Sequence, residues 1–355
     1  MAGFWKRLIG WMGGENETRV EGNLALSVVP DEAPPPEAPE PPLRVLRPDE
    51  VDTRGGEWWQ PRGEPVVAPP PRAPASIDAE LHAQLARVIN SPDLELPRMP
   101  QVAQRALGLL SGDSGANFRL LAEVVGADPA LSAQVLRMAN SAMYRGIREI
   151  TALDHAFSRI GTRNLRSIFL SVGAKGLLIK TGGTEKTLGE EIWQRAIVSA
   201  VVFTGFAKRL NIEEDEAFLA GLLHDLGMLG LIRIVHDYQR SHGRRIPRAV
   251  FDQVAVEWHE HLGLRIADAW NLPDPLPMLI GSHHKQPTDI DPLRRHKLLI
   301  QLSDVVYSML GYGEYVPYDF FNLPCVRGLN LEDDAAIRAT LSAIPEQIVA
   351  RLSEA

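Results

Sequence analysis

Histidine and aspartate side chains stand close together at several points in the second half of the chain, and both residue types bind divalent metal ions. His224 and Asp225 are adjacent within a long apolar run, His283 and His284 form a second adjacent pair, and His259 lies between the two pairs. Burying such groups without partners is costly, so they are expected to bind a metal ion or each other. The sequence therefore indicates a metal site or the remnant of one.

Helices are predicted to position these side chains. From about residue 76 onward apolar residues recur at helical spacing, and no stretch of useful length alternates as a strand would. Asp128 and Pro129 supply an N-cap and a proline at the first helical position. That helix is expected to end near Asn140, the next to run from Thr151 to Gly161, and Thr162 to cap the one after.

Further helices are expected over about 81–91, 189–210, 215–234, 247–270, 275–284, 293–311 and 333–353. The folded part of the chain is therefore predicted to be all-α.

A proline-rich segment precedes this helical part. Fourteen of the 27 prolines lie between Pro30 and Pro74, where they remove backbone donors and fix φ. Residues 13–76 are accordingly predicted to be a disordered, extended linker. The pair Trp58-Trp59 lies in this linker and is expected to be incidental, with partner docking as the alternative.

The first twelve residues form a short amphipathic peptide. Its apolar residues recur at helical spacing, and Lys6 and Arg7 lie on the other side. The apolar residues are Phe4, Trp5, Leu8, Ile9 and Met12. Such a short peptide does not hold a helix alone in water, so it is expected to dock on a partner protein or a membrane surface, or else to fray.

Composition limits the range of functions. At 355 residues and 45% apolar content the chain can bury a full core, and a net charge of -8 argues against general binding to nucleic acid. The single cysteine, Cys325, excludes an internal disulfide and suits a reducing cytoplasm. No apolar run reaches the ~18–20 residues of a membrane span, and the start does not match a secretion signal. A cytoplasmic protein without a transmembrane segment is expected.

Several motifs occur together in residues 94–348. In the front half they are Leu96-Pro-Arg-Met-Pro100, Asp128-Pro-Ala-Leu131, Arg137-Met-Ala-Asn-Ser141 and Ala156-Phe-Ser-Arg-Ile-Gly161. In the back half they are Ile192-Trp193, His224-Asp-Leu-Gly227, His259 four residues before Gly263, Trp270-Asn-Leu-Pro273, His283-His284 and Asp304. In this ordered combination the region resembles the HDOD family, relatives of the HD metal phosphohydrolases.

The resemblance implies one HDOD module over residues 77–352. It would consist of an amino-terminal helical subdomain and an HD-like bundle, preceded by the peptide 1–12 and the linker 13–76. Asn140 and Ser141 are expected to hydrogen-bond across the junction between the two subdomains. The histidines without a family counterpart are expected on the surface; these are His236, His242, His261 and His296.

The resemblance also implies where a first metal ion would bind in a catalytic relative. There, a first histidine, the His-Asp pair and a distant aspartate hold the ion. The first-histidine position corresponds to Arg195, whose guanidinium is permanently charged and has no lone pair for a metal. Beside Asp225 and Asp304 it is expected to neutralise the carboxylates and to replace the ion with a salt bridge.

Comparison with the HD-GYP phosphodiesterases implies a second set of metal ligands in this chain. Asp225, His259, His283 and His284 match its aspartate and histidines, which would suit iron, zinc or manganese. The segment that follows lacks the Gly-Tyr-Pro signature of those enzymes, and no upstream glutamate ligand is identifiable. We therefore expect no cofactor and assign no catalytic residue. The alternative is a bound divalent ion. Without an ion, His224 and Asp225 are expected to hydrogen-bond to each other.

The resemblance implies a role in bacterial signalling. With Arg195 at the first-histidine position, we expect a non-catalytic signalling or scaffold protein that binds a signalling partner through the HDOD surface and the amino-terminal peptide. One alternative is a metal-dependent phosphohydrolase with an Arg195-bearing site. Another is a nucleotide-binding module in which Arg195 contacts phosphate.

Overall fold

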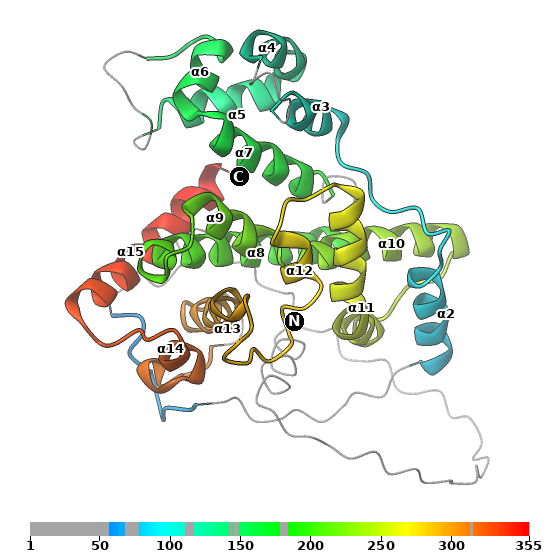
Figure 1. Cartoon of the computed structure of the whole chain (residues 1–355). Helices are drawn as coiled ribbons and strands as arrows, with labels where there is room; N and C mark the ends of the chain where they lie inside the picture. Colours follow the sequence, from blue (N-terminus) through cyan, green and yellow to red (C-terminus); the bar gives the residue numbers. More distant parts are fainter. Residues whose placement is uncertain are drawn as a thin grey trace.

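The computed structural model describes residues 57–67, 78–110, 117–141, 144, 149–177, 184–312 and 315–354. Throughout these ranges the regular structure is helical, apart from an isolated β-bridge between Val66 and Tyr318. The predicted all-α fold is confirmed, and the helices form two lobes (Figure 1).

The amino-terminal lobe has its own hydrophobic core, which includes Leu121, Val135 and Phe157. Its helices are α3 (Gln101–Leu110), α4 (Phe118–Gly126), α5 (Pro129–Ala139), α6 (Leu153–Ile160) and α7 (Thr162–Lys175). Apolar side chains at helical spacing on α4, α5 and α6 supply this core, so the lobe forms a separate packing unit.

Local signals explain the helix boundaries in this lobe. Asp128 caps α5 as predicted, since its side chain accepts a hydrogen bond from the Leu131 N–H at 3.1 Å. Gly161 ends α6 with φ of +82°, and Thr162 is the first residue of α7 rather than its side-chain cap. Asn140 bonds to both backbone groups of Ile150, so it fastens a loop within the lobe instead of crossing the junction.

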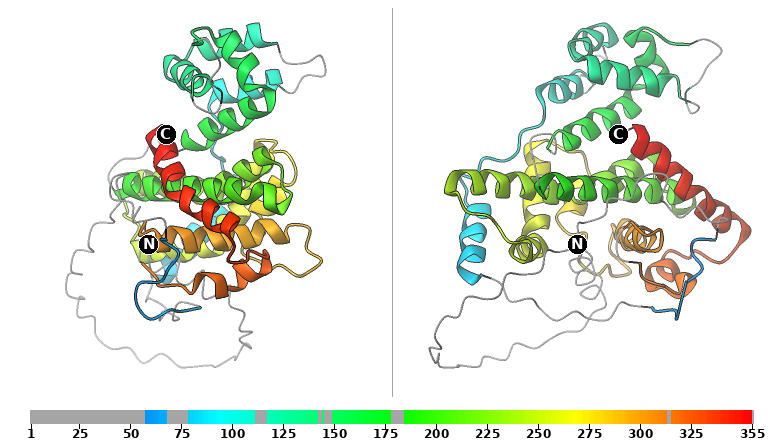
Figure 2. Two further views of the ribbon diagram at one scale, coloured as in Figure 1. Left: turned by 90° about the vertical axis from the view of Figure 1, so that its left-hand side faces the viewer. Right: turned by 180° about the vertical axis from the view of Figure 1, so that it is seen from behind.

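The second lobe contains the larger core. Its helices are α2 (Ala79–Ile89), α8 (Thr184–Leu210), α9 (Glu214–Leu223), α10 (Leu226–His242), α11 (Arg248–Ala269), α12 (Leu276–Ile280), α13 (Arg294–Met309), α14 (Pro324–Gly328) and α15 (Ala335–Glu354), with the short 3-10 helix η3 (Phe320–Asn322). Helix α8 packs against α9, α10, α13 and α15 and so forms the centre of the lobe. The carboxyl terminus lies where the lobes meet (Figure 2).

Two predicted helices are shorter than expected, and both differences concern the histidines. The predicted helix 215–234 is interrupted, because α9 ends at Leu223 and α10 begins at Leu226. The predicted helix 275–284 ends at Ile280, before Gly281, so His283 and His284 lie in the following turn. The segment Glu214–His242 is long and apolar enough to cross a membrane, but 89% of its apolar window is buried inside the protein, as in a core helix.

Residues 57–67 differ from the prediction of an extended linker. Trp58 and Trp59 are both buried, and the Trp58 indole N–H donates to the Leu341 carbonyl on α15 at 2.7 Å. The Trp58 ring also meets Phe320 edge-on. The expectation that this pair is incidental is therefore wrong, since both rings complete the core of the second lobe. The peptide 1–12, with its five apolar residues, and the rest of the linker lie outside the described residues.

Candidate metal centre

A close approach of two helices brings the metal-binding residue types together. A Cβ atom added to Gly227 on α10 would lie 1.8 Å from the His259 carbonyl oxygen on α11. Only glycine allows this contact, so Gly227 sets the distance between the His224-Asp225 junction and His259. Gly263, one turn after His259, faces the same crossing. The glycines of these two motifs therefore have a direct packing role.

Four side chains converge at this crossing. Asp225, His259, His283 and His284 each present one ligand atom, and these atoms all lie within 4.8 Å of one another. The His283 Nε2 atom is 3.4 Å from Asp225 Oδ1, and the His259 Nε2 atom is 3.7 Å from the same oxygen. All four side chains are buried. The structure thus brings together the four residues that the sequence predicted as a second ligand set.

Backbone carbonyls orient the imidazole rings. The Nδ1 atoms of His224, His259 and His283 lie 2.8, 2.5 and 3.0 Å from the carbonyl oxygens of residues 221, 255 and 280. A carbonyl oxygen only accepts, so each Nδ1 carries the hydrogen and each neutral ring directs its Nε2 lone pair inward. A histidine that binds a metal commonly donates its other N–H in this way.

This arrangement requires a cation between the rings. The Nε2 atoms of His259 and His283 are 3.2 Å apart, and two lone pairs at that distance repel unless a proton or a metal ion lies between them. Neither Asp225 oxygen and neither His284 ring nitrogen has a hydrogen-bond partner among the described residues. Four ligand atoms that surround an ion tetrahedrally at about 2.1 Å would lie about 3.4 Å from one another, close to the spacings of 3.2, 3.4 and 3.7 Å among His259, His283 and Asp225. The cluster therefore fits one divalent ion.

The electrostatics agree with a cation site. Burial lowers the pKa of His224 to about 4 and that of His284 well below its ordinary value. Burial opposes ionisation of Asp225, but His224 and His283 hold its pKa below the ordinary range. The pKa of His283 is raised against the effect of burial, through its contact with Asp225. Asp225 thus favours a positive charge beside it, either a proton on His283 or a metal ion.

Arg195 and Asp304, which the resemblance assigned to the first-metal position, form an ion pair. Arg195 on α8 donates to Asp304 on α13 at 2.5 Å, and the guanidinium carbon lies 4.0 Å from the centre of the Tyr307 ring. Both partners are buried. Burial raises the pKa of Asp304 to about 6, and Arg195 limits that rise. Asp225, in contrast, is surrounded by histidines rather than paired with Arg195 in the way that the sequence led us to expect.

Some residues of this region were missed or misplaced from the sequence. Glu260 accepts a hydrogen bond from the His284 N–H at 2.7 Å and lies 3.7 Å from His283 Nδ1. Its position next to His259 was the available signal. His296 was expected on the surface, but it is buried and bonded to Glu216 at 2.9 Å. The other three histidines expected there are exposed or half-buried, namely His236, His242 and His261.

The chain is similar in sequence to a known protein family and to a protein of another organism. An HDOD domain profile matches residues 96–286. The chain is 25% identical over 275 residues to an uncharacterised protein of Treponema pallidum (strain Nichols), a match that covers 75% of this chain and 52% of that protein. The chain therefore spans about half the length of this relative.

Solved structures with the same fold include three proteins of bacterial origin. A candidate metal-dependent phosphohydrolase of Shewanella amazonensis SB2B matches with a TM-score of 0.60 and 20% identity, over 76% of this chain and 98% of that one. An HDOD domain protein of unknown function from Geobacter sulfurreducens matches at 0.53 and 22%, over 77% and 98%. A candidate signal transduction protein of Marinobacter aquaeolei VT8 matches at 0.53 and 21%, over 78% and 65%.

The motifs, the two helical lobes and the profile match agree with one another. The profile covers more than half of the chain, and the solved structures share its fold. The chain belongs to the HDOD family.

Proposed function

We propose that this HDOD protein acts in signal transduction by binding a partner protein, without catalysing hydrolysis, and that its histidine cluster holds one divalent metal ion as a structural element. The observation that carries the proposal is the buried pair of Arg195 and Asp304. A permanent cation already neutralises the aspartate there and repels an incoming ion. A two-metal phosphohydrolase needs that position for an ion.

The residues that would hold the structural ion are Asp225, His259, His283 and His284. A bound ion would supply the charge that the converging lone pairs of His259 and His283 require and would cross-link α10, α11 and the turn after α12. Iron, zinc and manganese suit this donor set. Metal binding of this kind contributes directly to folding stability.

Burial of the histidine cluster is a second argument against hydrolysis of a substrate at this site. Each of the four side chains is no more than 4% exposed. A phosphate ester cannot reach the ligand atoms unless the helices around them move apart. This degree of burial is typical of a structural ion, whereas a catalytic site keeps a position open to substrate.

The partner-binding part of the proposal rests on the family and on the absence of an assigned catalytic residue. One relative of the same fold is described as a candidate signal transduction protein. We further propose that the peptide 1–12 contributes to binding and that the protein is cytoplasmic and bacterial. Comparing proteins captured from cell extract by the full chain and by a chain without residues 1–12 tests this part. An unchanged set would make the peptide passive.

The competing function is metal-dependent phosphohydrolysis, which the intact four-ligand cluster favours. Metal content and the hydrolysis of bis(4-nitrophenyl) phosphate, measured on the same protein, separate the two. The proposal expects about one ion per chain, lost in the His259→Ala and His283→Ala variants, and no turnover with iron, zinc or manganese. Metal-dependent turnover that disappears in these variants would establish the hydrolase instead.

The third alternative, phosphate binding by Arg195, is less well supported. Its guanidinium is buried, donates to Asp304 and lies against Tyr307. A phosphate group would have to displace a buried carboxylate to form a bidentate contact.

A further inference from the structure

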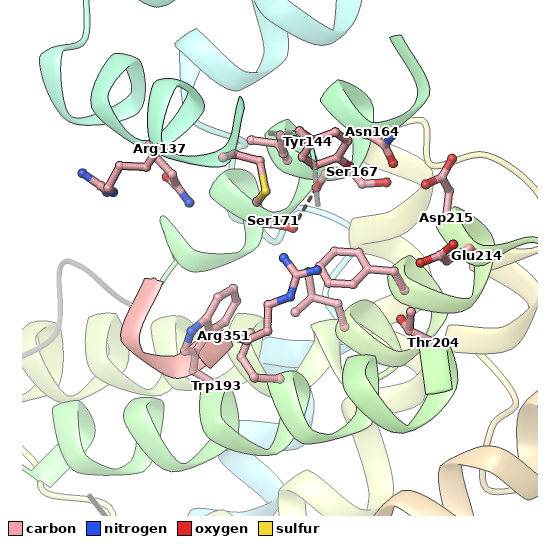
Figure 3. Close-up of a pocket in the computed structure, with 16 residues that line it drawn as sticks. Arg137, Tyr144, Asn164, Ser167, Ser171, Trp193, Thr204, Glu214, Asp215 and Arg351 are labelled. Carbon is pink, nitrogen blue, oxygen red and sulfur yellow. Dashed lines mark hydrogen bonds between the residues drawn. The ribbon is translucent and has the colours of Figure 1, made fainter. Parts of the chain in front are cut away.

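A second site lies at the junction of the two lobes, away from the histidine cluster. It is a pocket of about 130 Å³ formed by α5 and α7 of the amino-terminal lobe together with α8, α9 and α15 (Figure 3). A cavity of about 150 Å³ holds a benzene molecule, so this volume accommodates a molecular body of about six non-hydrogen atoms. The pocket therefore has the size of a small metabolite.

Two buried polar groups line the pocket without using their hydrogen-bonding capacity. The Trp193 side chain on α8 is 9% exposed and the Ser167 side chain on α7 is 7% exposed. Neither the Trp193 indole N–H nor the Ser167 hydroxyl has a hydrogen-bond partner among the described residues. An indole N–H can only donate, so an acceptor atom on a molecule in the pocket would satisfy it.

Charged groups of both signs line the pocket, and the Arg351 guanidinium lies between the two ends (Figure 3). Glu214 and Asp215 lie at the beginning of α9, whereas Arg137 comes from α5 and Arg351 from α15. Figure 3 shows the two carboxylates on one side and Arg137 on the opposite side, with Trp193 nearer the arginine side. Between them the lining is largely apolar and includes the Phe218 ring, 5.6 Å from the Arg351 guanidinium carbon.

We propose that this pocket binds a small elongated zwitterion, whose carboxylate lies at Arg137 and Trp193 and whose ammonium or guanidinium group lies at Glu214 and Asp215. An apolar body of the ligand would occupy the space beside Phe218. Such a molecule matches both the separated charges and the unused Trp193 donor. Asp215 lies 3.4 Å from Arg163 in the ligand-free protein, so the cationic group of the ligand would share that contact or replace it.

The pocket is separate from the metal centre in space, although some residues of the two sites are close in sequence. Trp193 and Arg195 are two residues apart on α8, a rotation of about 200°, so they leave opposite faces of that helix. Leu222, another lining residue, precedes His224 by two positions. Because the walls come from both lobes, a bound ligand would connect them. This inference does not depend on the proposed metal ion or on partner binding.

Calorimetric titration of the full chain with 6-aminohexanoate tests the proposal, with hexanoate and hexylamine as controls that each lack one charge. A millimolar dissociation constant is the weakest expected for a ligand of this size, and titration to about 50 mM covers that range. The expected result is binding of the zwitterion at least about tenfold tighter than either control, since each control loses a charge-assisted contact.

Variants identify the site. Asp215→Asn removes the carboxylate charge, and Trp193→Phe removes the indole N–H while keeping a ring. Each should weaken 6-aminohexanoate binding about tenfold, whereas Glu123→Gln, an exposed residue on α4 outside the pocket, should not. Unfolding temperatures and metal content are measured first, to confirm that each variant is folded. No binding of 6-aminohexanoate, equal binding of the three compounds, or wild-type affinity in both pocket variants overturns the proposal.

Discussion

Replacing Arg195 with alanine tests the ion pair on which the proposed function depends. The guanidinium donates to Asp304 at 2.5 Å, and both residues are buried. Removing one partner of a buried ion pair costs about 3–5 kcal/mol, because the remaining charge has no compensation. Loss of the contact with Tyr307 adds roughly 0.5–2 kcal/mol. The free energy of unfolding in urea should therefore fall by at least about 3 kcal/mol.

The pH dependence separates the charge effect from a simple cavity. Without Arg195, the pKa of Asp304 should rise above its present value of about 6. At low pH the carboxyl is then protonated and neutral, so the loss of stability should be smaller at pH 5 than at pH 8. An equal loss at both values would indicate a cavity effect alone.

A matched double variant completes this test. Replacing a buried pair by apolar residues of similar volume is often neutral or stabilising, so Arg195→Met combined with Asp304→Leu should recover most of the lost stability. Unchanged stability of Arg195→Ala at every pH would mean that the guanidinium does not compensate Asp304.

Three further outcomes are expected. Gly227→Ala places a Cβ against the His259 carbonyl, so it should lower the free energy of unfolding in urea by about 1–3 kcal/mol or more and reduce the metal content. The control Gly108→Ala, where no atom lies within 4 Å of the added Cβ, should be neutral or stabilising. Equal effects of the two variants would contradict the close helix crossing. Trp58→Ala should cost about 3–5 kcal/mol and Trp58→Phe about 1 kcal/mol, and an unaffected unfolding temperature would remove residues 57–67 from the core. In metal-free protein the low pKa of His224, about 4 against 6.5, should make stability fall as the pH drops through that interval, by roughly 3 kcal/mol at most from this group. Urea unfolding at pH 7 and 5 measures it, and the slope should be smaller in His224→Gln.

The features of the site that depend on residue chemistry could be predicted from the sequence. The incompatibility of a guanidinium with a metal ion, together with the family resemblance, placed Arg195 beside Asp304. The same resemblance selected the four residues that converge in the second cluster. Asp128 and Pro129 gave the start of α5 because capping is a local property of the chain.

The features that depend on long-range contacts could not be predicted. The helix break at His224 and Asp225 lies in a run that is buried on all sides, so its apolar pattern contains no signal for a terminus. The proline content around Trp58 predicts an absence of helix and strand there, as observed. It contains no information on the contacts of the Trp58 ring with α15 and Phe320, which are distant in the sequence. His296 is buried through Glu216, a partner 80 residues away in the chain.

Anomalous diffraction from crystals of protein purified without chelators would locate any metal ion in the histidine cluster. We expect one metal peak per chain, bounded by Asp225, His259, His283 and His284, and no metal between Arg195 and Asp304. A two-ion cluster with Arg195 turned away, or histidines bonded to one another without an ion after soaking in zinc, manganese or iron, would contradict this expectation.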